Sequence, residues 1–387
     1  MSITQTSTQT ARTVSAGSYH ARVTDGWSVA DWPWRPGAST VFQRPEWLEP
    51  LYAAIARHEP DIQPLTVEVQ DEQGALAFRL ALILRRIGSR RIVEFADLNM
   101  TDFNAPLLGP AAPRTAQEAA RAWKAVKRAL PRCDAVRFTK MPPLVGGRPN
   151  PLTLLSGRLP AAVNGNLIAI GEGWNTFHFG LERTVRKELE RSWRVFSRAD
   201  GAGLHAVTDP DAALDVLNRM ERLQSRRMRE LGQPYTMDDP VTADFYRRLI
   251  ARGLTQGYAV LTLLRSHNEL VAALLGVRDG DSYVMIRLAH AGSDWSRVSP
   301  GRLLIHKTLE RLHSEGCRTF DFSIGNYAYK RRFGPVRTPL FDHVEARSLK
   351  GLPMALHARA AGWLRRRPAL RERVRRLMGK TASREEF

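Results

Sequence analysis

Three apolar runs of strand length follow one another in the second half of the chain, separated only by short polar turns. They are Tyr258–Leu264, Leu270–Val277 and Ser282–Ala289. Strands joined by such short connections pair with each other in antiparallel fashion. The runs therefore predict an antiparallel meander, and they constrain the fold more than any other feature of the sequence.

Helical patterns surround this meander. Before it, Asp209-Pro210 provides an N-cap acid and a first-turn proline for a helix over Asp211–Leu231, and a further helix is expected at Val241–Arg252. After it, a helix over Pro300–Glu315 ends at Gly316, and a strand at Thr319–Ser323 must return to the same sheet. Helices, a meander, a helix and a returning strand indicate an α+β fold with a mixed sheet.

The first half of the chain reads as another α/β unit. Its expected elements are a helix at Pro45–Arg57, strands at Leu65–Val69, Ala75–Leu84 and Arg91–Phe95, a helix at Thr115–Leu130 and a strand at Ala135–Thr139. A cluster of proline and glycine then interrupts the chain. We predict a disordered N-terminus over 1–25, a first domain over 26–145, a crossing segment over 146–173, a second domain over 174–350 and an arginine-rich tail over 351–387.

Several classes of protein are disfavoured by what the sequence lacks. Cys133 and Cys317 stand far apart and form no Cys/His cluster, which is typical of a reduced compartment and argues against a structural zinc site. We find no HExxH, Walker A, Rossmann or Ser-His-Asp pattern in its required context. No secretory signal or apolar run of membrane-spanning length is visible. We expect a metal-free cytoplasmic protein, peripheral to the membrane at most.

The junction from Arg297 to Arg302 has the features of an anion site. Ser299 suits an N-cap, Pro300 suits the first helical turn, and Gly301 lets another group approach the backbone closely. A helix N-terminus with Arg297 and Arg302 beside it can hold a pyrophosphate. The alternative is an ordinary capped helix.

A second cluster follows the strand at Thr319–Ser323. Asp321 leaves the strand end, and aromatic and cationic residues follow it, among them Tyr329 and Lys330. Asp321 can accept a proton from an amine or orient a sugar hydroxyl, and Lys330 can bind phosphate or carboxylate. Equally, Asp321 can be a cap and Lys330 a solvated charge.

These residues carry a resemblance to a known family. The order Ser299-Pro300-Gly301, Leu304, Gly316, Asp321-Phe322, Gly325 and Tyr329-Lys330 resembles the C-terminal signature of the CelD/BcsL acetyltransferases, a GNAT branch related to the FemAB aminoacyltransferases. Asp102-Phe103-Asn104-Ala105-Pro106 is similar to a loop of the family's first half. The resemblance implies two GNAT-like domains in tandem. It also implies an acyl-CoA donor, such as acetyl-CoA, at the loop before Pro300, and an acceptor in the cleft between the halves.

Candidate site residues follow from both lines of reasoning. Asp321 and His290, the latter at the end of the third meander strand, are the candidate proton acceptors. Asp102 and Asn104 are candidates for contacts to sugar hydroxyls, although both also suit a turn. Tyr329 and Lys330 complete the expected substrate site. His290 can instead be an ordinary structural histidine.

The charge balance is strongly basic. The chain has 58 Lys and Arg against 39 Asp and Glu, a net charge of +19, and the tail over 351–387 has ten Lys and Arg against three Glu. Arg367, Arg371 and Arg375 recur every four residues of this tail. Such a pattern can lie on an anionic membrane, bind a regulatory cyclic dinucleotide, or be a solvated basic helix.

Three functions remain in view. The first is an N-acetyltransferase that acts on an amino sugar or lipid-linked saccharide in exopolysaccharide, holdfast-like adhesin or envelope synthesis. The second is FemAB-like aminoacyl transfer from tRNA to a peptidoglycan precursor. The third is a protein that binds nucleic acid or a cyclic dinucleotide on a degenerate GNAT scaffold, although contact with nucleic acid other than tRNA is not expected.

Overall fold

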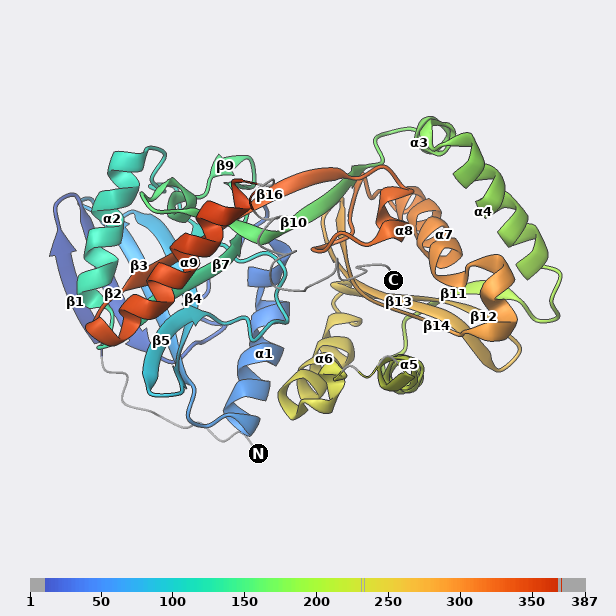
Figure 1. The fold of residues 1–387 in the computed structure, drawn as a ribbon, viewed down its shortest axis with the longest axis horizontal. Coiled ribbons are helices and arrows are strands. Elements are labelled where there is room, and N and C mark those ends of the chain that lie inside the picture. Colours follow the sequence, from blue (N-terminus) through green and yellow to red (C-terminus); the bar gives the residue numbers. More distant parts are fainter. Residues whose placement is uncertain (1–10, 231, 233, 368–369, 371–387) are drawn as a thin grey trace. The chain divides into compact units, whose positions relative to one another are not determined.

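The chain forms two compact units. The computed structural model describes residues 11–230, 232, 234–367 and 370. Unit 1 comprises the described residues up to Ala162 together with those from Pro339 onward, and unit 2 comprises Val163–Thr338. Strands β10 (Leu159–Ala169) and β16 (Val336–Ala346) carry the chain from one unit to the other (Figure 1).

Unit 2 is built on the predicted meander, which is confirmed. Strands β12 (Ala259–Ser266), β13 (Glu269–Asp279) and β14 (Ser282–His290) pair antiparallel in sequence. β15 (Thr319–Asp321) returns parallel to β14, so the sheet is mixed. The strand order within the unit is β10-β15-β14-β13-β12-β11, with β11 at Gly203–Val207.

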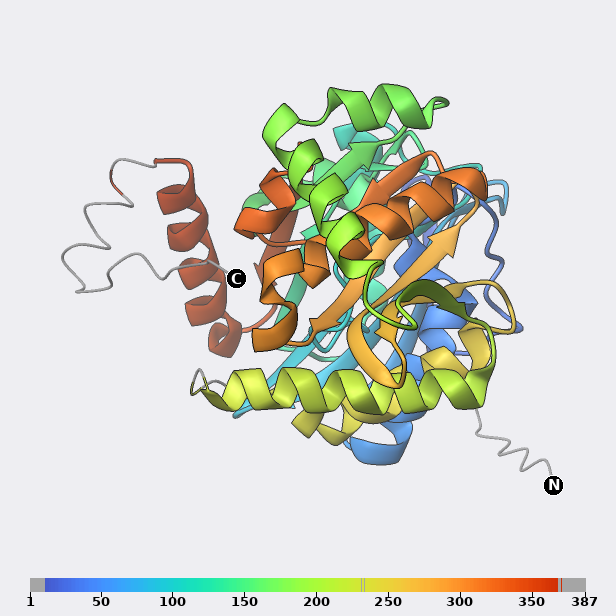
Figure 2. The same cartoon turned by 90° about the vertical axis from the view of Figure 1, so that its right-hand side faces the viewer.

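Helices cover both faces of this sheet. Figure 1 shows α4 (Arg183–Phe196) and α7 (Pro300–Ser314) on one face and α5 (Pro210–Glu230) and α6 (Pro240–Gly253) on the other. Figure 2 shows α5 along its whole length. Two short helices complete the unit, α3 (Trp174–Gly180) and α8 (Ala328–Arg331). The face under α4 and α7 buries a continuous apolar core, to which β13, β14 and β15 contribute Leu274, Met285 and Phe320.

Local signals set the helix ends as the sequence indicates. The Asp209 carboxylate accepts a hydrogen bond from the Ala212 N–H at 2.7 Å at the start of α5. Gly316 follows α7 with a φ of +91°, a conformation that favours glycine. These predictions are confirmed.

Unit 1 contains a sheet of order β1-β2-β3-β4-β5-β7-β16. Its bounds are β3 (Gln63–Asp71), β4 (Leu76–Ile87), β5 (Arg90–Phe95) and β7 (Ala135–Met141), with the short β6 (Leu107–Leu108) beside β4 and the hairpin β8 (Leu144–Val145) and β9 (Arg148–Pro149) apart from it. Its helices are α1 (Pro45–His58), α2 (Ala116–Ala129) and α9 (Leu352–Arg365). A capping box between Thr115 and Glu118 fixes the start of α2.

The N-terminal segment corrects one prediction. We expected disorder over 1–25, but β1 (Ala11–Ala16) and β2 (Tyr19–Asp25) form a hairpin at the edge of the unit 1 sheet. Tyr19, Ala21 and Val23 alternate into the core, and β2 pairs with β3. The pairing partner lies more than forty residues away, so the local Ser/Thr-rich composition does not reveal it. Residues 1–10 lie outside the described residues.

The C-terminal segment also differs from expectation. The chain after Thr338 belongs to unit 1, because β16 pairs antiparallel with β7, and α9 follows in the same unit. The predicted second domain over 174–350 therefore includes a strand that lies partly in the first unit. The expected crossing segment 146–173 includes β10, which makes one of the two crossings.

Candidate functional site

An opening in the unit 2 sheet separates β14 from β15. The two strands pair only from Ser282/Thr319 to Val284/Asp321. β14 then continues to His290, paired on its other side with β13, while β15 ends at Asp321 and Phe322 bonds to Asn166 of β10. The register between β13 and β14 shifts where Leu275 faces Arg287 and Gly276 faces Met285, so β14 bulges at Ile286. A bulge disrupts the ladder and frees a backbone group at an edge.

The N-terminus of α7 lies beside the last residues of β14. A Cβ built on Gly301 would lie 3.1 Å from Cδ2 of His290 and 3.3 Å from a methyl group of Leu288. Gly301 is therefore needed for close approach, as predicted, and the approaching groups in the structure are these two side chains. His290 and Leu288 face α7.

Ser299 begins α7 in an unusual conformation. Its φ of +47° is in the left-handed region, which costs an L-residue on the order of 1 kcal/mol. Ser299 is the N-cap residue of α7, as predicted, but its side chain makes no capping hydrogen bond: the Ser299 hydroxyl accepts a hydrogen bond from the Arg302 guanidinium at 2.7 Å. Pro300 has no N–H, so the first turn offers the N–H groups of Gly301 and Arg302.

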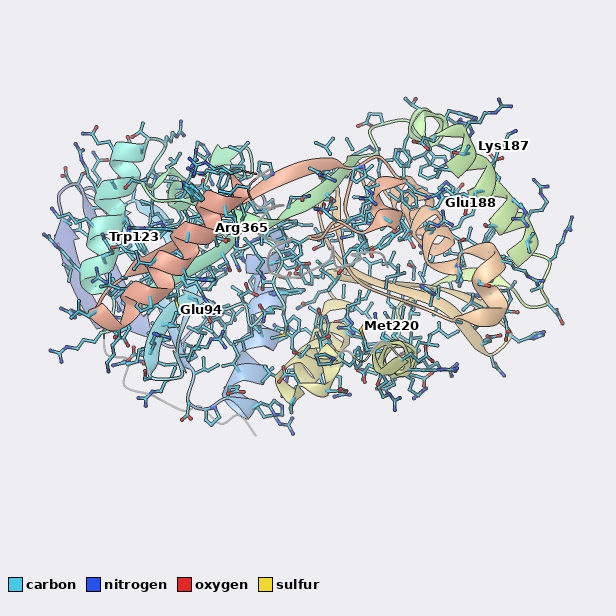
Figure 3. The ribbon with its side chains drawn as sticks, viewed as in Figure 1. Glu94, Trp123, Lys187, Glu188, Met220 and Arg365 are labelled. Atoms are coloured by element: carbon cyan, nitrogen blue, oxygen red, sulfur yellow. The ribbon has the colours of Figure 1, made fainter. Side chains whose placement is uncertain are left out.

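Glu188, which Figure 3 labels on α4, holds the start of α7 through Arg302. Arg302 donates to both carboxylate oxygens of Glu188, one of them at 3.1 Å, and Arg332 donates to the same carboxylate at 3.3 Å. The Arg302 side chain thus joins the start of α7 to Glu188 of α4. Arg297 is exposed, and among the described residues no ion pair is recorded for it. Of the two predicted arginines, Arg297 is the one whose charge is not already matched.

Three side chains hold the loop after β15. The Asp321 carboxylate accepts the Ser323 N–H at 2.6 Å, and Ser323 has a φ of +66°. Asn166 on β10 donates to the carbonyls of Ser323 and Gly325 at 2.8 and 2.9 Å. The Lys330 ammonium donates to the carbonyls of Phe322 and Ile324 at 2.7 and 2.6 Å. A second strained serine is thus fixed on the other side of the opening.

Lys330 is not the exposed cation that the sequence suggested. Only 3% of it is exposed, and its ammonium lies 5.0 Å from the ring centroid of Tyr327. Tyr329 stacks on Tyr327 with centroids 5.9 Å apart, and burial, reinforced by Tyr327, raises the pKa of the Tyr329 hydroxyl. The geometry makes Lys330 a support of the loop, and Tyr327 presents an exposed ring.

The opposite face of β14 carries a group that sequence reasoning missed. The Arg287 guanidinium donates to Gln224 of α5 and, at 3.0 Å, to the hydroxyl of Tyr235, and it lies 4.8 Å from the ring centroid of Tyr246. Its buried Nε has no hydrogen-bond partner within the described chain. The sequence signal that could have revealed this residue is a single arginine within an otherwise mostly apolar strand.

The first-half candidates lie in unit 1. Asn104 is 1% exposed, and its amide nitrogen donates to Asp97 at 2.7 Å and to the Thr139 carbonyl at 3.0 Å. Asp102 is half-buried nearby in the sequence. The amide nitrogen of Asn104 therefore joins this loop to Asp97 and to β7, and the predicted substrate contacts of Asn104 and Asp102 stay predictions.

Of the proposed regulatory arginines, only one falls in the described chain. Arg367 lies 3.8 Å from the ring centroid of Trp363. Arg371 and Arg375 lie outside the described residues. No cluster of three His, Cys, Asp or Glu suited to a metal is found in the part that the structure describes. Over the same part, no helix is both long and apolar enough to cross a bilayer.

Comparison with known proteins bears on the stretch that contains the opening, the start of α7 and the clamped loop. Residues 183–331 match the acetyltransferase (GNAT) domain. The match spans α4 through α8, so every unit 2 candidate discussed above except Asn166 and Arg332 lies within the matched stretch. No curated protein matches the sequence.

Solved structures extend the likeness beyond the GNAT domain. The crystal structure of FemX matches with a TM-score of 0.56 at 10% identity, covering 86% of this chain and 96% of that one. A tandem GNAT protein from the clavulanic acid biosynthesis pathway matches at 13% identity with a TM-score of 0.41, and the match covers 77% of this chain and 88% of that one. L-PGS from Bacillus licheniformis matches at 13% identity with a TM-score of 0.44, and the match covers 81% of this chain and 96% of that one. The FemX likeness confirms the predicted α+β fold of GNAT-like units in tandem.

Proposed function

We propose that this protein is an acyltransferase that moves an acyl group, acetyl in the simplest case, from acyl-CoA to an amine. The carrying observation is that β14 opens from β15 beside the first turn of α7, within the stretch that matches the GNAT domain. The N–H groups of Gly301 and Arg302 and the positive end of the α7 dipole suit the donor pyrophosphate. Arg297 supplies an unmatched charge beside them.

The opened edge of β14 suits the thioester. Backbone N–H groups at the bulge near Ile286 can donate to the carbonyl oxygen and stabilise the oxyanion as the amine attacks. The new C–N bond forms and the C–S bond breaks, so CoA leaves as a thiolate. His290, which lies against Gly301, is our favoured acceptor of the amine proton, because Asp321 already accepts the Ser323 N–H.

The anionic group of the acceptor is proposed to bind at Arg287 on the other face of β14, while its amine reaches through the opening between β14 and β15 toward His290. A guanidinium with an unpartnered buried Nε, flanked by Gln224 and Tyr235, suits a carboxylate or phosphate. This supports an amino sugar that carries an anionic group, such as a lipid-linked saccharide diphosphate of exopolysaccharide or envelope synthesis. Tyr327 offers an exposed ring on which a sugar can stack.

The test is acyl transfer by the purified full chain. The chain is incubated with acetyl-CoA and a panel of neutral and phosphorylated amino sugars, CoA release is followed with a thiol reagent, and products are identified by mass spectrometry. We expect transfer with a preference for the phosphorylated acceptors. His290→Asn should lower kcat, whereas His267→Asn, a matched change at an exposed turn, should not. Asp321→Asn keeps an oxygen for Ser323 and should stay active. Absence of both transfer and CoA binding would reject the function.

Aminoacyl transfer from tRNA is a second candidate. One observation favours it: α4 presents exposed cations along its outer face, namely Arg183, Lys187, Arg191 and Arg194. Such a surface suits a phosphate backbone. Charged tRNA as donor, compared with acetyl-CoA in the same assay, separates the two, and tRNA binding with a steep salt dependence but no transfer would point to a binding protein on this fold.

A further inference from the structure

Helix α9 packs with its small residues inward and its large apolar residues outward. Ala355 and Gly362 are its buried positions, and a Cβ on Gly362 would lie 2.9 Å from a methyl group of Leu159. Leu352, Leu356 and Trp363 are 43%, 60% and 52% exposed, and Leu349, just before the helix, is 83% exposed. A helix that served only to cover unit 1 would have the opposite arrangement.

The outward residues form one stripe. At 100° per residue, Leu352, Leu356 and Trp363 fall within an arc of about 40°. Arg359 and Arg366 fall on one flank of this stripe, and Arg367 lies against the Trp363 ring. From Leu349 to Arg367 the chain has five Lys and Arg and no Asp or Glu.

The orientation of α9 is fixed by contacts with neighbouring residues of unit 1. Arg365, which Figure 3 labels on α9, donates to the Pro160 carbonyl at 2.9 Å and pairs with Asp342 at 3.7 Å. Arg366 donates to the Arg158 carbonyl at 3.4 Å. These contacts prevent the helix from rolling its apolar stripe inward, so the stripe is a fixed feature of the surface.

A basic hollow adjoins the start of this helix. Its volume is about 510 Å³, and it is lined by Arg12, Arg91, Lys127, Arg128, Arg132 and Arg347, together with Cys133, Asp134 and Ser348. The single carboxylate, Asp134, is occupied by the Ser348 hydroxyl and the Arg91 N–H. Within the described residues, no ion pair is formed by Arg12, Arg91 or Arg132. Arg347 and Ser348 are followed directly by the exposed Leu349.

The combination favours a membrane over another protein. From their exposed fractions, the four apolar side chains present on the order of 400 Å², whereas a stable protein interface needs ~800 Å² per partner. Leucine and tryptophan flanked by arginine are typical of segments that lie in the headgroup region of a bilayer. Cations beside such a segment attract anionic lipid.

We propose that unit 1 docks on an anionic phospholipid bilayer. The stripe formed by Leu349, Leu352, Leu356 and Trp363 enters the headgroup boundary, and the basic hollow takes a lipid phosphate. This inference stands independently of the acyltransfer reaction in unit 2.

The experiment is co-sedimentation of the full chain with vesicles of phosphatidylcholine alone or mixed with phosphatidylglycerol. We expect binding to the mixed vesicles only. The triple variant L352S/L356S/W363S should weaken it by at least about tenfold, while L144S/F179S/V336S, which removes exposed apolar residues elsewhere, should not. R12Q/R91Q/R132Q should weaken it more than R183Q/R191Q/R194Q, which removes the same charge from α4.

A second readout covers loss of folding in the variants. Brominated lipid should quench wild-type tryptophan fluorescence, and Trp363→Phe should remove the quenched component while it still binds. Vesicle binding by the stripe variant at wild-type strength would overturn the proposal, since the segment after α9 is present in both. An unquenched Trp363 would also overturn it. The same holds for a change of oligomeric state in place of vesicle binding, and for binding of inorganic phosphate without any binding of vesicles.

Discussion

Replacing Lys330 with methionine tests whether this residue holds the loop after β15. Methionine keeps the length and apolar stem of the side chain, so no large cavity opens. The ammonium that serves the carbonyls of Phe322 and Ile324 is lost. Hydrogen bonds to a charged group contribute about 1.5 kcal/mol each, so two amount to about 3 kcal/mol, less the cost of burying the charge. We expect Lys330→Met to lower the free energy of unfolding by about 2 kcal/mol.

The assay is urea unfolding of the full chain, combined with amide hydrogen exchange over residues 322–327. The matched control is Arg331→Met, an exposed neighbour, which should change the free energy of unfolding by less than about 0.5 kcal/mol. Faster exchange in the loop should accompany the Lys330 change. If Lys330→Met unfolds like wild type while acyl transfer disappears, Lys330 binds substrate and the structural assignment is wrong.

Three further predictions concern pH and the α7 junction. Burial, with Lys307 and His178 nearby, lowers the pKa of His306 to about 3. As the pH falls below the ordinary pKa near 6.5, the unfolded chain takes up a proton that the folded chain does not, so the free energy of unfolding should fall by about 1 kcal/mol per pH unit. His306→Gln should flatten this slope, as measured by urea midpoints at pH 7 and 5. Burial alone would raise the pKa of Glu345, but hydrogen bonds from Lys127 and Trp123, with His343 3.5 Å away, lower it to about 2. The resulting stability is present above the ordinary pKa of about 4.5 and is lost as the pH falls toward 2, so Glu345→Gln should cost about 2 kcal/mol at pH 7 and nothing at pH 2. Glu188→Gln should raise KM for acyl-CoA with kcat little changed, because Arg302 and Ser299 lose their anchor, whereas Glu182→Gln at the exposed start of α4 should leave KM as it is.

The elements set by local patterns could be predicted. The meander of β12, β13 and β14 follows from apolar runs joined by short turns, and the ends of α5 and α7 follow from Asp209 and Gly316. What failed depends on distant partners. The β1–β2 hairpin rests on β3, and β16 pairs with β7 some two hundred residues earlier in the chain.

The site shows the same division. Sequence reasoning proposed the start of α7, His290 and the segment after β15, because a glycine after Ser-Pro and a carboxylate at a strand end are local signals. It could not see that Lys330 is buried among carbonyls or that Arg302 is held by Glu188 from another helix. It also missed Arg287, because the hydrogen bonds of this residue to Gln224 and Tyr235, on the face of β14 away from α7, are not visible in the sequence.

The central claim is that acyl-CoA binds where β14 opens beside α7. Amide hydrogen exchange of the full chain with and without acetyl-CoA tests it most directly, because it locates the bound donor without knowledge of the acceptor. We predict slower exchange over residues 285–290 and 297–303, with the α2 helix unchanged as an internal control. Protection that falls elsewhere, or no protection at saturating acetyl-CoA, would contradict the account.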